Sequence, residues 1–423
     1  MAMSHFVQSL STEIDSILPT VEAIYQDLHR NPELSFQETR TAGIVARKLR
    51  EAGFEVTEKV GGTGVVGLLR NGPGPTVAMR ADMDALPIRE LTGLPYASTR
   101  EAANAKGERV PVSHACGHDL HTAWLLGTAT VLAGACDAWK GTLLLLFQPA
   151  EEIGAGSQAM LDDGLTERFP RPEVVLGQHL LNYRAGAIGL RAGLLCAAAD
   201  SYKVTFFGKG GHGGLPQNAI DPILMAANAV VRLQGIVARE VSPLVSTVIT
   251  IGEFHAGTAE NIIPAEATIT LNVRNTDAAT RERVLASIRR ICIAEAQASN
   301  APQEPAFELI SQFPLTSNDA GVVQKVAEAF RAPFGDRVFE MQPLGGSEDF
   351  SRFGTAWKAP YAFWFVGGTA LDVYDRALAE GTTAQLPGPH SPYWAPALEP
   401  TLRTGIEGGL AALGAWLAEG AHG

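Results

Sequence analysis

The sequence predicts an α/β protein in which a small α+β domain of the ferredoxin-like type is inserted into a larger α/β domain. Short apolar runs of strand length alternate with helical patterns towards both ends of the chain, and such alternation is typical of layered α/β domains. The middle of the chain instead follows the order β-α-β-β-α-β, which is the ferredoxin-like pattern. At 423 residues the chain also exceeds what one hydrophobic core usually supports.

The first part of the chain begins with two helical patterns and continues with strands. Apolar residues recur at helical spacing from Ser11 to Arg30, and Asn31-Pro32 ends that helix. The expected elements are helices over 11–30, about 37–52 and about 119–133, and strands over 54–57, 65–69, 76–81 and 142–147. Helices that alternate with strands cover both faces of a sheet, so catalytic loops are expected at strand ends.

The inserted part and the final part are predicted in the same way. The expected elements of the insertion are strands over 202–207, 245–254, 267–273 and 307–310 and helices over 218–233 and 279–298. The α/β character returns near Ser317, with a helix over 322–329 and an apolar run over 361–366. We therefore expect a first domain part over 1–187, an inserted domain over 188–312 and a second part of the first domain over 313–423.

The composition indicates a folded protein without an electrostatic affinity for nucleic acid. The net charge is −12, and 46% of residues are hydrophobic against 18% charged, which excludes disorder and gives no reason to approach nucleic acid or anionic lipid. Four scattered cysteines do not make a disulfide framework and suit a reducing compartment. We expect a cytoplasmic protein, because the first residues do not read as a secretion signal. We expect no membrane span, because the long uncharged stretch over 120–136 contains His121 and favours a buried helix.

Potential metal ligands lie directly before the predicted helix 119–133. Cys116 and His118 alternate in the sequence Ser-His-Ala-Cys-Gly-His-Asp, and alternate side chains of an extended segment point the same way. The two could therefore face one ion together. The alternative is an ordinary loop that precedes a helix.

Acidic residues follow two predicted strands. Glu151 and Glu152 come just after the strand 142–147, where paired acids can divide the roles of metal ligand and general base; the alternative is a solvated loop. Asp82 and Asp84 follow the strand 76–81, where a carboxylate could orient a ligating imidazole or bridge two metals. A turn with helix-capping aspartates explains this second pair equally well.

Three further histidines, at an expected strand end or in loops, are candidates for metal binding or catalysis. His179 follows the apolar run 174–176 and Gly177, at an expected strand end, and His390 lies in a late proline-rich loop. Either alone would more often be structural, but together with the other candidates they could furnish ligands for two metal ions. His212 lies in a glycine-rich loop of the inserted domain and is a candidate donor to a transition state. That loop lacks a phosphate-binding fingerprint, so nucleotide binding is not expected.

An ordered set of motifs spans nearly the whole chain. Its members are HRNPELSFQE (29–38), RADMDALPI (80–88), CGHD (116–119), QPAEE (148–152), GGH (210–212), GTAENIIP (257–264) and GSEDF (346–350). This set resembles the hippurate hydrolase and auxin-conjugate hydrolase branch of the metallopeptidase superfamily that also contains aminoacylases and carboxypeptidase G-type enzymes. The resemblance implies a metallopeptidase-type catalytic domain with an inserted lid and dimerisation domain.

The resemblance also implies roles for individual residues. Its substrate-facing residues in the lid fall on His212, Asn261 and Arg274, and its general base falls on Glu151. Pairing through the lid would give a homodimer or homotetramer. The metal ligands that the resemblance implies are Cys116, His118, Glu152, His179 and His390.

We therefore expect an amidohydrolase that cuts the amide bond of an N-acyl amino acid with two divalent metal ions. In this hypothesis Glu151 deprotonates water, His212 stabilises the oxyanion, and Arg274 with Asn261 holds the substrate carboxylate. The metals could be zinc, manganese, cobalt or nickel, because all accept thiolate, imidazole and carboxylate ligands. The alternatives are a dipeptidase or carboxypeptidase with the same centre and, less favoured, a non-catalytic binding protein.

Overall fold

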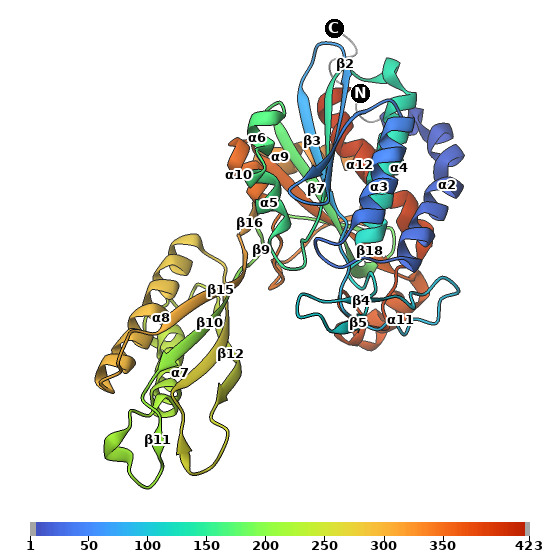
Figure 1. Cartoon of the computed structure of the whole chain (residues 1–423). Helices are drawn as coiled ribbons and strands as arrows, with labels where there is room; N and C mark the ends of the chain where they lie inside the picture. The colour runs from blue at the N-terminus through green and yellow to red at the C-terminus, as the bar shows by residue number, and fades with distance from the viewer. Residues whose placement is uncertain (1–5, 419–423) are drawn as a thin grey trace. The chain divides into compact units, whose positions relative to one another are not determined.

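The computed structural model describes residues 6–418, and the chain divides into two compact units. The larger unit comprises Met1–Leu195, Ser317–Gln342 and Asp349–Gly423, and the smaller unit comprises Cys196–Thr316 and Pro343–Glu348. The chain therefore forms most of the smaller unit in one insertion, returns to the larger unit at Ser317 and later adds the short segment Pro343–Glu348 to the smaller unit. Each unit has its own hydrophobic core, as expected for separate domains. Figure 1 shows both units.

The larger unit is built on an eight-stranded mixed sheet with the order β1-β2-β6-β3-β7-β18-β8-β17. The central strands β6, β3, β7 and β18 are parallel, whereas β1, β2 and β6 pair antiparallel. Its strands are β1 (Glu55–Val60), β2 (Gly64–Asn71), β3 (Thr76–Asp82), β6 (Gly141–Gln148), β7 (Val174–Arg184), β8 (Ile188–Leu190), β17 (Val338–Glu340) and β18 (Tyr361–Thr369). Short strands outside this sheet are β4 (Glu101–Ala103), β5 (Arg109–Pro111), β9 (Gly193–Cys196) and β16 (Thr316–Asn318).

Helices surround this sheet (Figure 1). They are α1 (Phe6–Ser9), α2 (Ser11–Arg30), α3 (Thr39–Glu51), α4 (His118–Gly134), α5 (Gly156–Asp162), α6 (Leu165–Arg168), α9 (Ala320–Phe334), α10 (Ser351–Trp357), α11 (Leu371–Glu380) and α12 (Leu398–Leu417). Helix α4 packs against α2, α12 and β3, and α12 also contacts β7 and β18. The layered α/β architecture expected from the sequence is confirmed.

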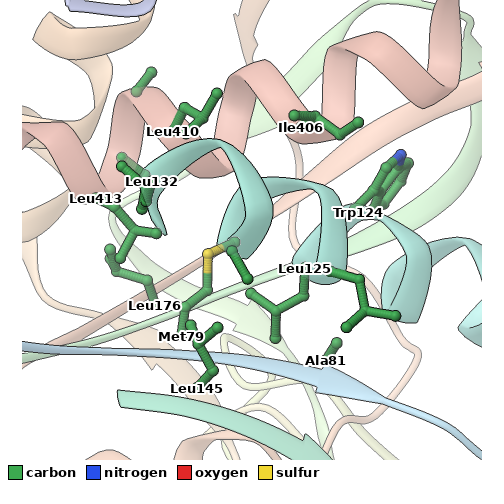
Figure 2. Close-up of a cluster of buried hydrophobic side chains, with 14 of the residues drawn as sticks. Met79, Ala81, Trp124, Leu125, Leu132, Leu145, Leu176, Ile406, Leu410 and Leu413 are labelled. Carbon is green, nitrogen blue, oxygen red and sulfur yellow. The ribbon is translucent and has the colours of Figure 1, made fainter. Parts of the chain in front are cut away.

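The main core lies between α4, α12 and the central strands (Figure 2). Side chains from β3, β6 and β7, such as Met79, Leu145 and Leu176, meet Leu125 of α4 and Leu410 of α12. The two helices approach closely at Gly405 of α12, where a Cβ atom would lie only 2.1 Å from the Trp124 ring. The long uncharged stretch is thus a buried helix, as expected, and within residues 6–418 no helix has the length and apolarity needed to cross a membrane.

The smaller unit is an antiparallel sheet with the order β12-β14-β10-β15, on which α7 and α8 pack. Its elements are β10 (Ala198–Phe207), β11 (Gly211–His212), α7 (Pro222–Arg239), β12 (Thr247–Ala256), β13 (Ile262–Ile263), β14 (Glu266–Asn275), α8 (Ala278–Ala298) and β15 (Ala306–Phe313). This strand order and the β-α-β-β-α-β succession confirm the ferredoxin-like fold.

Two element boundaries differ from the sequence expectation for physical reasons. The strand expected over 174–176 continues to Arg184, so His179 lies inside β7 and not beyond its end. Gly177 does not end the strand; it makes room for Phe363, whose ring would lie 2.7 Å from a Cβ atom there. The helix expected from 218 begins at Pro222, because Asp221 accepts a hydrogen bond from the Ile223 amide and caps it there.

Candidate metal centre

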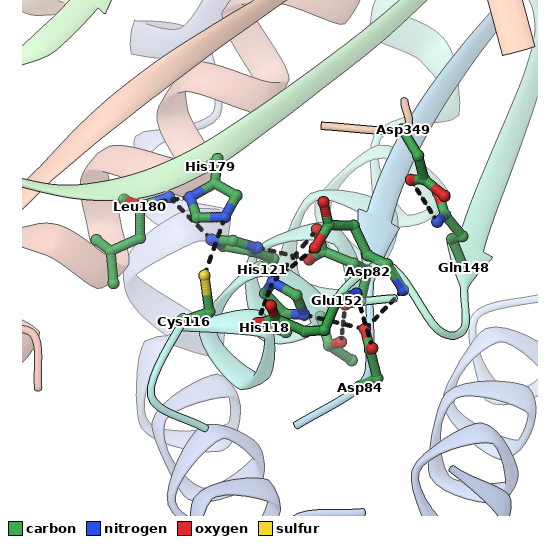
Figure 3. Close-up of polar contacts among 12 residues, drawn as sticks. Asp82, Asp84, Cys116, His118, His121, Gln148, Glu152, His179, Leu180 and Asp349 are labelled. Atoms are coloured by element: carbon green, nitrogen blue, oxygen red, sulfur yellow. Dashed lines mark hydrogen bonds and ion pairs between the residues drawn. The ribbon is translucent and has the colours of Figure 1, made fainter. Parts of the chain in front are cut away.

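The candidate centre of the larger unit lies where β3 and β6 end and α4 begins (Figure 3). Asp82 is the last residue of β3, and Asp84 follows it in the loop. Glu151 and Glu152 follow β6, and His118 is the first residue of α4. His179 points into the same place from the middle of β7. Five segments that are distant in the sequence, including the loop of His390, thus supply the polar side chains of one site.

The turn before α4 separates Cys116 from His118. Gly117 has a left-handed backbone with φ of 81°, and a Cβ atom there would lie 2.7 Å from the Leu180 side chain, so only glycine fits. The segment is therefore a turn and not extended as expected, so the alternation of side chains does not apply to Cys116 and His118. Donor atoms of Cys116 gather with those of Glu152 and His390. Those of His118 gather with Glu151 and Glu152 and, in a further group, with Asp82, His121 and His179.

His118 presents one ring nitrogen to a carboxylate and the other to the centre. Its Nδ1 lies 3.2 Å from Asp84 Oδ1, while its buried Nε2 has no hydrogen-bond partner among the described residues. Although burial lowers the pKa of His118, the carboxylates of Asp82, Asp84 and Glu152 outweigh it and raise the pKa to about 10. So much negative charge around one imidazole favours binding of a cation.

Cys116, Glu152 and His390 form the second group of donors, within 4.8 Å of one another. His390 Nε2 lies 3.2 Å from Glu152 Oε2, and the buried Glu152 Oε1 has no hydrogen-bond partner within residues 6–418. His390 has a left-handed backbone, with φ of 69°, and its amide donates to the Ala115 carbonyl at 2.7 Å. Burial and the neighbouring carboxylates raise the pKa of the Cys116 thiol well above its usual value. Glu152 belongs to this group and to the group of His118 and Glu151, and therefore links the two.

His179 has the hydrogen bonding of a metal ligand. Its Nδ1 donates to the Leu180 carbonyl at 2.6 Å, and its Nε2 lies 3.5 Å from Cys116 Sγ. Burial holds the pKa of His179 well below its usual value, so the ring is neutral and Nε2 carries a lone pair. A ligating histidine commonly fixes its other nitrogen on a carbonyl in this manner.

His121 was not singled out from the sequence, although it lies beside these groups. Its spacing of three residues from His118 on one helix puts the two side chains on one face, which is the signal that could have found it. Its Nδ1 lies 2.6 Å from Asp82 Oδ1, and its Nε2 accepts the Leu180 amide proton at 2.8 Å. Both ring nitrogens are therefore hydrogen-bonded. His121 has no free lone pair for a metal ion and instead holds Asp82 and Leu180 in place.

The donor set fits borderline divalent metals. A thiol, three imidazoles and two carboxylates converge, and two of the buried donors, His118 Nε2 and Glu152 Oε1, have no hydrogen-bond partner within the described residues. Buried polar atoms are normally satisfied, and these two face each other at 3.7 Å without a hydrogen bond, so a bound cation could satisfy both. Mixed sulfur, nitrogen and oxygen ligands suit zinc and its neighbours in the first transition row.

The smaller unit carries the three remaining candidates at two separate places. His212 is exposed on β11, and the Asn261 carbonyl accepts the Gly213 amide next to it at 2.8 Å. Arg274 lies near the other end of the sheet, where it pairs with Ala199, and donates to the Gly345 carbonyl at 2.6 Å. Asn261 and Arg274 of one lid therefore do not lie together, because the length of β14 separates them.

Comparison with known proteins places the chain among metallopeptidases. It matches the model of peptidase family M20/M25/M40 over residues 78–378. It is 42% identical to hippurate hydrolase of Campylobacter jejuni (84% of this chain, 90% of that protein) and 38% identical to thermostable carboxypeptidase 2 of Saccharolobus solfataricus (85% and 89%).

A solved structure supports the same assignment. The YXEP protein of Bacillus subtilis, described as a dinuclear metal-binding peptidase of the M20 family, matches 94% of this chain and 98% of its own with a TM-score of 0.74 and 29% identity. Since the family model covers most of the chain and the relatives match it almost throughout, the chain belongs to peptidase family M20/M25/M40.

Proposed function

We propose that this protein is a metal-dependent amidohydrolase that cleaves the amide bond of N-acyl amino acids such as N-benzoylglycine. The observation that carries the proposal is that Glu152 joins the donor group of Cys116 and His390 to that of His118 and Glu151. The similarity to hippurate hydrolase over most of both chains supports an N-acyl amino acid as the substrate class.

Two divalent metal ions, of the zinc, manganese, cobalt and nickel class, are proposed as cofactors. Glu152 would help to hold them, because it belongs to the group of Cys116 and to the group of His118. Two metal ions when bound lower the pKa of water and polarise the substrate carbonyl. The proposed ligands are Cys116, His118, Glu152, His179 and His390.

Glu151 is proposed as the general base. It is 95% buried and belongs to the donor group of His118 and Glu152, so a proton that it accepts from water is kept away from solvent. It would then return the proton to the amine of the leaving amino acid, which completes a general acid-base cycle. Asp84 is proposed to orient His118, since its carboxylate oxygens are occupied by His118, Ser35 and the amides of Glu151 and Glu152.

The lid residues are proposed to act in a homodimer or homotetramer. One substrate cannot contact both Arg274 and the His212 and Asn261 pair of the same lid, because the length of β14 lies between them, roughly 25 Å at strand geometry. Two subunits could supply them to one site, with His212 stabilising the oxyanion and Arg274 holding the carboxylate. The edge strand β12 exposes Val248 and Phe254, which offers a surface for pairing.

The second candidate function is that of a dipeptidase or carboxypeptidase, which the similarity to thermostable carboxypeptidase 2 favours. A panel of N-benzoylglycine, N-acetyl amino acids and dipeptides, run on protein loaded with each metal in turn, separates the two functions. Faster hydrolysis of dipeptides than of any N-acyl amino acid would overturn the first proposal.

All four cysteines are free thiols, which supports the further proposal of a cytoplasmic, reducing location.

A further inference from the structure

The loop that carries Glu151 is held in an unusual backbone conformation. Ala150, the residue before Glu151, has a left-handed backbone with φ of 49° and is fully buried. Residues with a Cβ atom adopt this conformation at a cost and keep it only when the surroundings enforce it. Neighbouring groups must therefore hold the backbone of Ala150 in this conformation. The same conformation sets the direction of the next residue, Glu151.

The carboxylate of Glu38 contacts Ala150, although the two residues are 112 positions apart in the sequence. Its Oε1 accepts the Ala150 amide proton at 2.9 Å and the Phe36 amide proton at 3.0 Å, and its Oε2 accepts the Thr63 hydroxyl. Phe36 is also left-handed, with φ of 62°. One fully buried oxygen thus serves two non-glycine residues in the same strained conformation.

Glu38 does not serve the helix at whose start it stands. It is the N-cap residue of α3, yet within the described chain its side chain makes no capping bond. That task belongs to Glu33, whose two oxygens accept the amides of Arg40 and Thr41 at 2.9 and 2.8 Å. The carboxylate of Glu38 is therefore free of the helix and serves Phe36, Thr63 and Ala150, the last of which is 112 residues away.

Asp84 continues the same support along the loop. It accepts the amides of Glu151 and Glu152, both at 3.1 Å. On the opposite side of the peptide, the Ala150 carbonyl accepts the Gly156 amide at 3.0 Å. Three successive amides thus donate to two buried carboxylates, and Ala150 is fixed at both its amide and its carbonyl.

We propose that Glu38 is a positioning residue for catalysis: it holds Ala150 left-handed and thereby aims the carboxylate of Glu151 into the site. This inference rests on the proposed function of Glu151 as general base. It also gives a role to the motif HRNPELSFQE, whose last residue is Glu38.

Two conservative substitutions of Glu38 distinguish the effect of side-chain length from the effect of negative charge. Glu38→Gln keeps the length of the side chain and an oxygen for the Ala150 amide, and its amide group can donate to the Thr63 hydroxyl. Glu38→Asp keeps the charge but is one methylene too short to reach. Burial and the nearby Asp84 carboxylate raise the pKa of Glu38 to about 7, so an uncharged side chain is also compatible with this environment.

The experiment compares Glu38→Gln, Glu38→Asp and Glu38→Ala with Glu33→Ala as the matched control, because Glu33 caps the same helix without touching Ala150. We expect Glu38→Asp and Glu38→Ala to lower kcat roughly 10–100-fold with metal content and KM nearly unchanged, since a small misplacement of a reacting group has such effects. Glu38→Gln and Glu33→Ala should keep kcat within a few-fold of the wild type.

A second readout does not depend on activity. Hydrogen exchange measured by mass spectrometry on a peptide that contains Ala150 should be faster in Glu38→Asp and Glu38→Ala than in Glu38→Gln, Glu33→Ala and the wild type. Unchanged exchange, or equal kcat losses in Glu38→Gln and Glu38→Asp, would overturn the proposal. If the metal-loaded wild type hydrolyses no N-acyl amino acid, the proposed function fails, while the exchange result still decides whether Glu38 holds the loop.

Discussion

His121 and His179 lie against each other, with ring centroids 4.4 Å apart, yet their hydrogen bonds give them different chemistry. Nε2 of His179 is directed at Cys116, whereas Nε2 of His121 already accepts the Leu180 amide. Only His179 can offer a lone pair to a metal. The distinction depends on the surroundings of each ring and not on the residue type.

Substitution of these two histidines should therefore have unequal effects on metal binding. We expect His179→Gln to retain fewer than two metal ions per subunit after dialysis. His121→Gln should retain both, with affinity lowered about 10–100-fold, because groups that support ligands typically have effects of that size. Elemental analysis and competition with a chelator measure both quantities. Equal loss of metal from the two variants would contradict the assignment of the ring nitrogens.

For single residues, the sequence predicts candidate metal ligands better than it predicts the residues that hold those ligands in position. Cys116, His118, Glu152 and His390 are predicted as ligands because ligand-type residues in these motifs are distinctive, and the structure gathers their donor atoms in two groups that share Glu152. Glu38 escaped functional interpretation because its contact with Ala150 spans 112 residues. Local pattern carries no information on such a pairing, which exists only after the chain has folded.

Among the elements, α2 and α4 are joined by a buried ion pair directly beside the metal centre. His29, in the last turn of α2, lies 2.6 Å from Asp119 of α4 and 3.0 Å from Glu90. Burial lowers the pKa of His29, but the hydrogen bonds to Asp119 and Glu90 outweigh it and raise the pKa to about 10. The charged imidazole thus fixes the first turn of α4, which begins at His118.

This ion pair should make stability depend on pH. Since the folded pKa of His29 lies above the unfolded value of about 6.5, its stabilisation is fully present below pH 6.5 and is lost as pH rises through 10. We expect His29→Gln to lower the free energy of unfolding by on the order of 3 kcal/mol at pH 6 and by less at pH 9.5. Urea unfolding followed by tryptophan fluorescence at both values tests this, and a pH-independent difference would argue against the pair.

Strand β3 carries a second buried network, centred on Arg80. The guanidinium is fully buried and lies 2.6 Å from Asp82 and 3.2 Å from Asp349, and it donates to Gln148 at 2.8 Å. Asp82 in turn holds His121. The network thus links the segment that begins at Asp349 to Asp82 and His121, which lie beside the candidate metal ligands.

Removal of Arg80 should be costly because two carboxylates would remain buried without their cation. We expect Arg80→Met to lower the free energy of unfolding by about 3–5 kcal/mol. Arg70→Met is the control, since Arg70 pairs with Glu55 on the surface, where ion pairs contribute about 0–1 kcal/mol. All six tryptophans belong to the larger unit, so their fluorescence reports on the unit that contains both arginines. Similar losses in the two variants would contradict the role of the network.

The order and type of the main elements were predictable because each has a strong period and clear end signals. Helix α2 ends at Arg30, before Asn31-Pro32, as the sequence indicates. The extent of β7 was not predictable, because Gly177 resembles a strand end in the sequence. Its true role, to admit Phe363, depends on a strand that is far away in the chain.

For the whole molecule, the insertion of one domain into another was visible in the change of element order at both ends of the ferredoxin-like pattern. The sequence does not reveal on its own that Arg274 and His212 lie far apart on the same lid. The pairing of β10 with β14 and of β11 with β13 shows this separation. It is the reason why the proposed site draws on two subunits.

A shared site should be detectable by complementation. Dimers of Glu151→Gln and dimers of His212→Ala are each expected to be nearly inactive. Mixed dimers contain one site with both an intact base and an intact donor, so random exchange should restore about a quarter of the wild-type turnover. Differently tagged chains confirm that mixed dimers form. Confirmed mixed dimers without recovered turnover would place His212 in its own subunit's site or outside the chemistry.

The central claim is that Glu151 acts as the base of a two-metal amidohydrolase, and one measurement on matched proteins tests it most directly. Wild type and Glu151→Gln are loaded with the same metal, analysed for metal content and assayed with N-benzoylglycine and N-acetyl amino acids. We expect two metal ions per subunit in both proteins and a kcat that is lower in Glu151→Gln by at least about 10²–10⁴. Near-wild-type turnover by Glu151→Gln, or metal-free wild type that is as active as the loaded enzyme, would contradict the account.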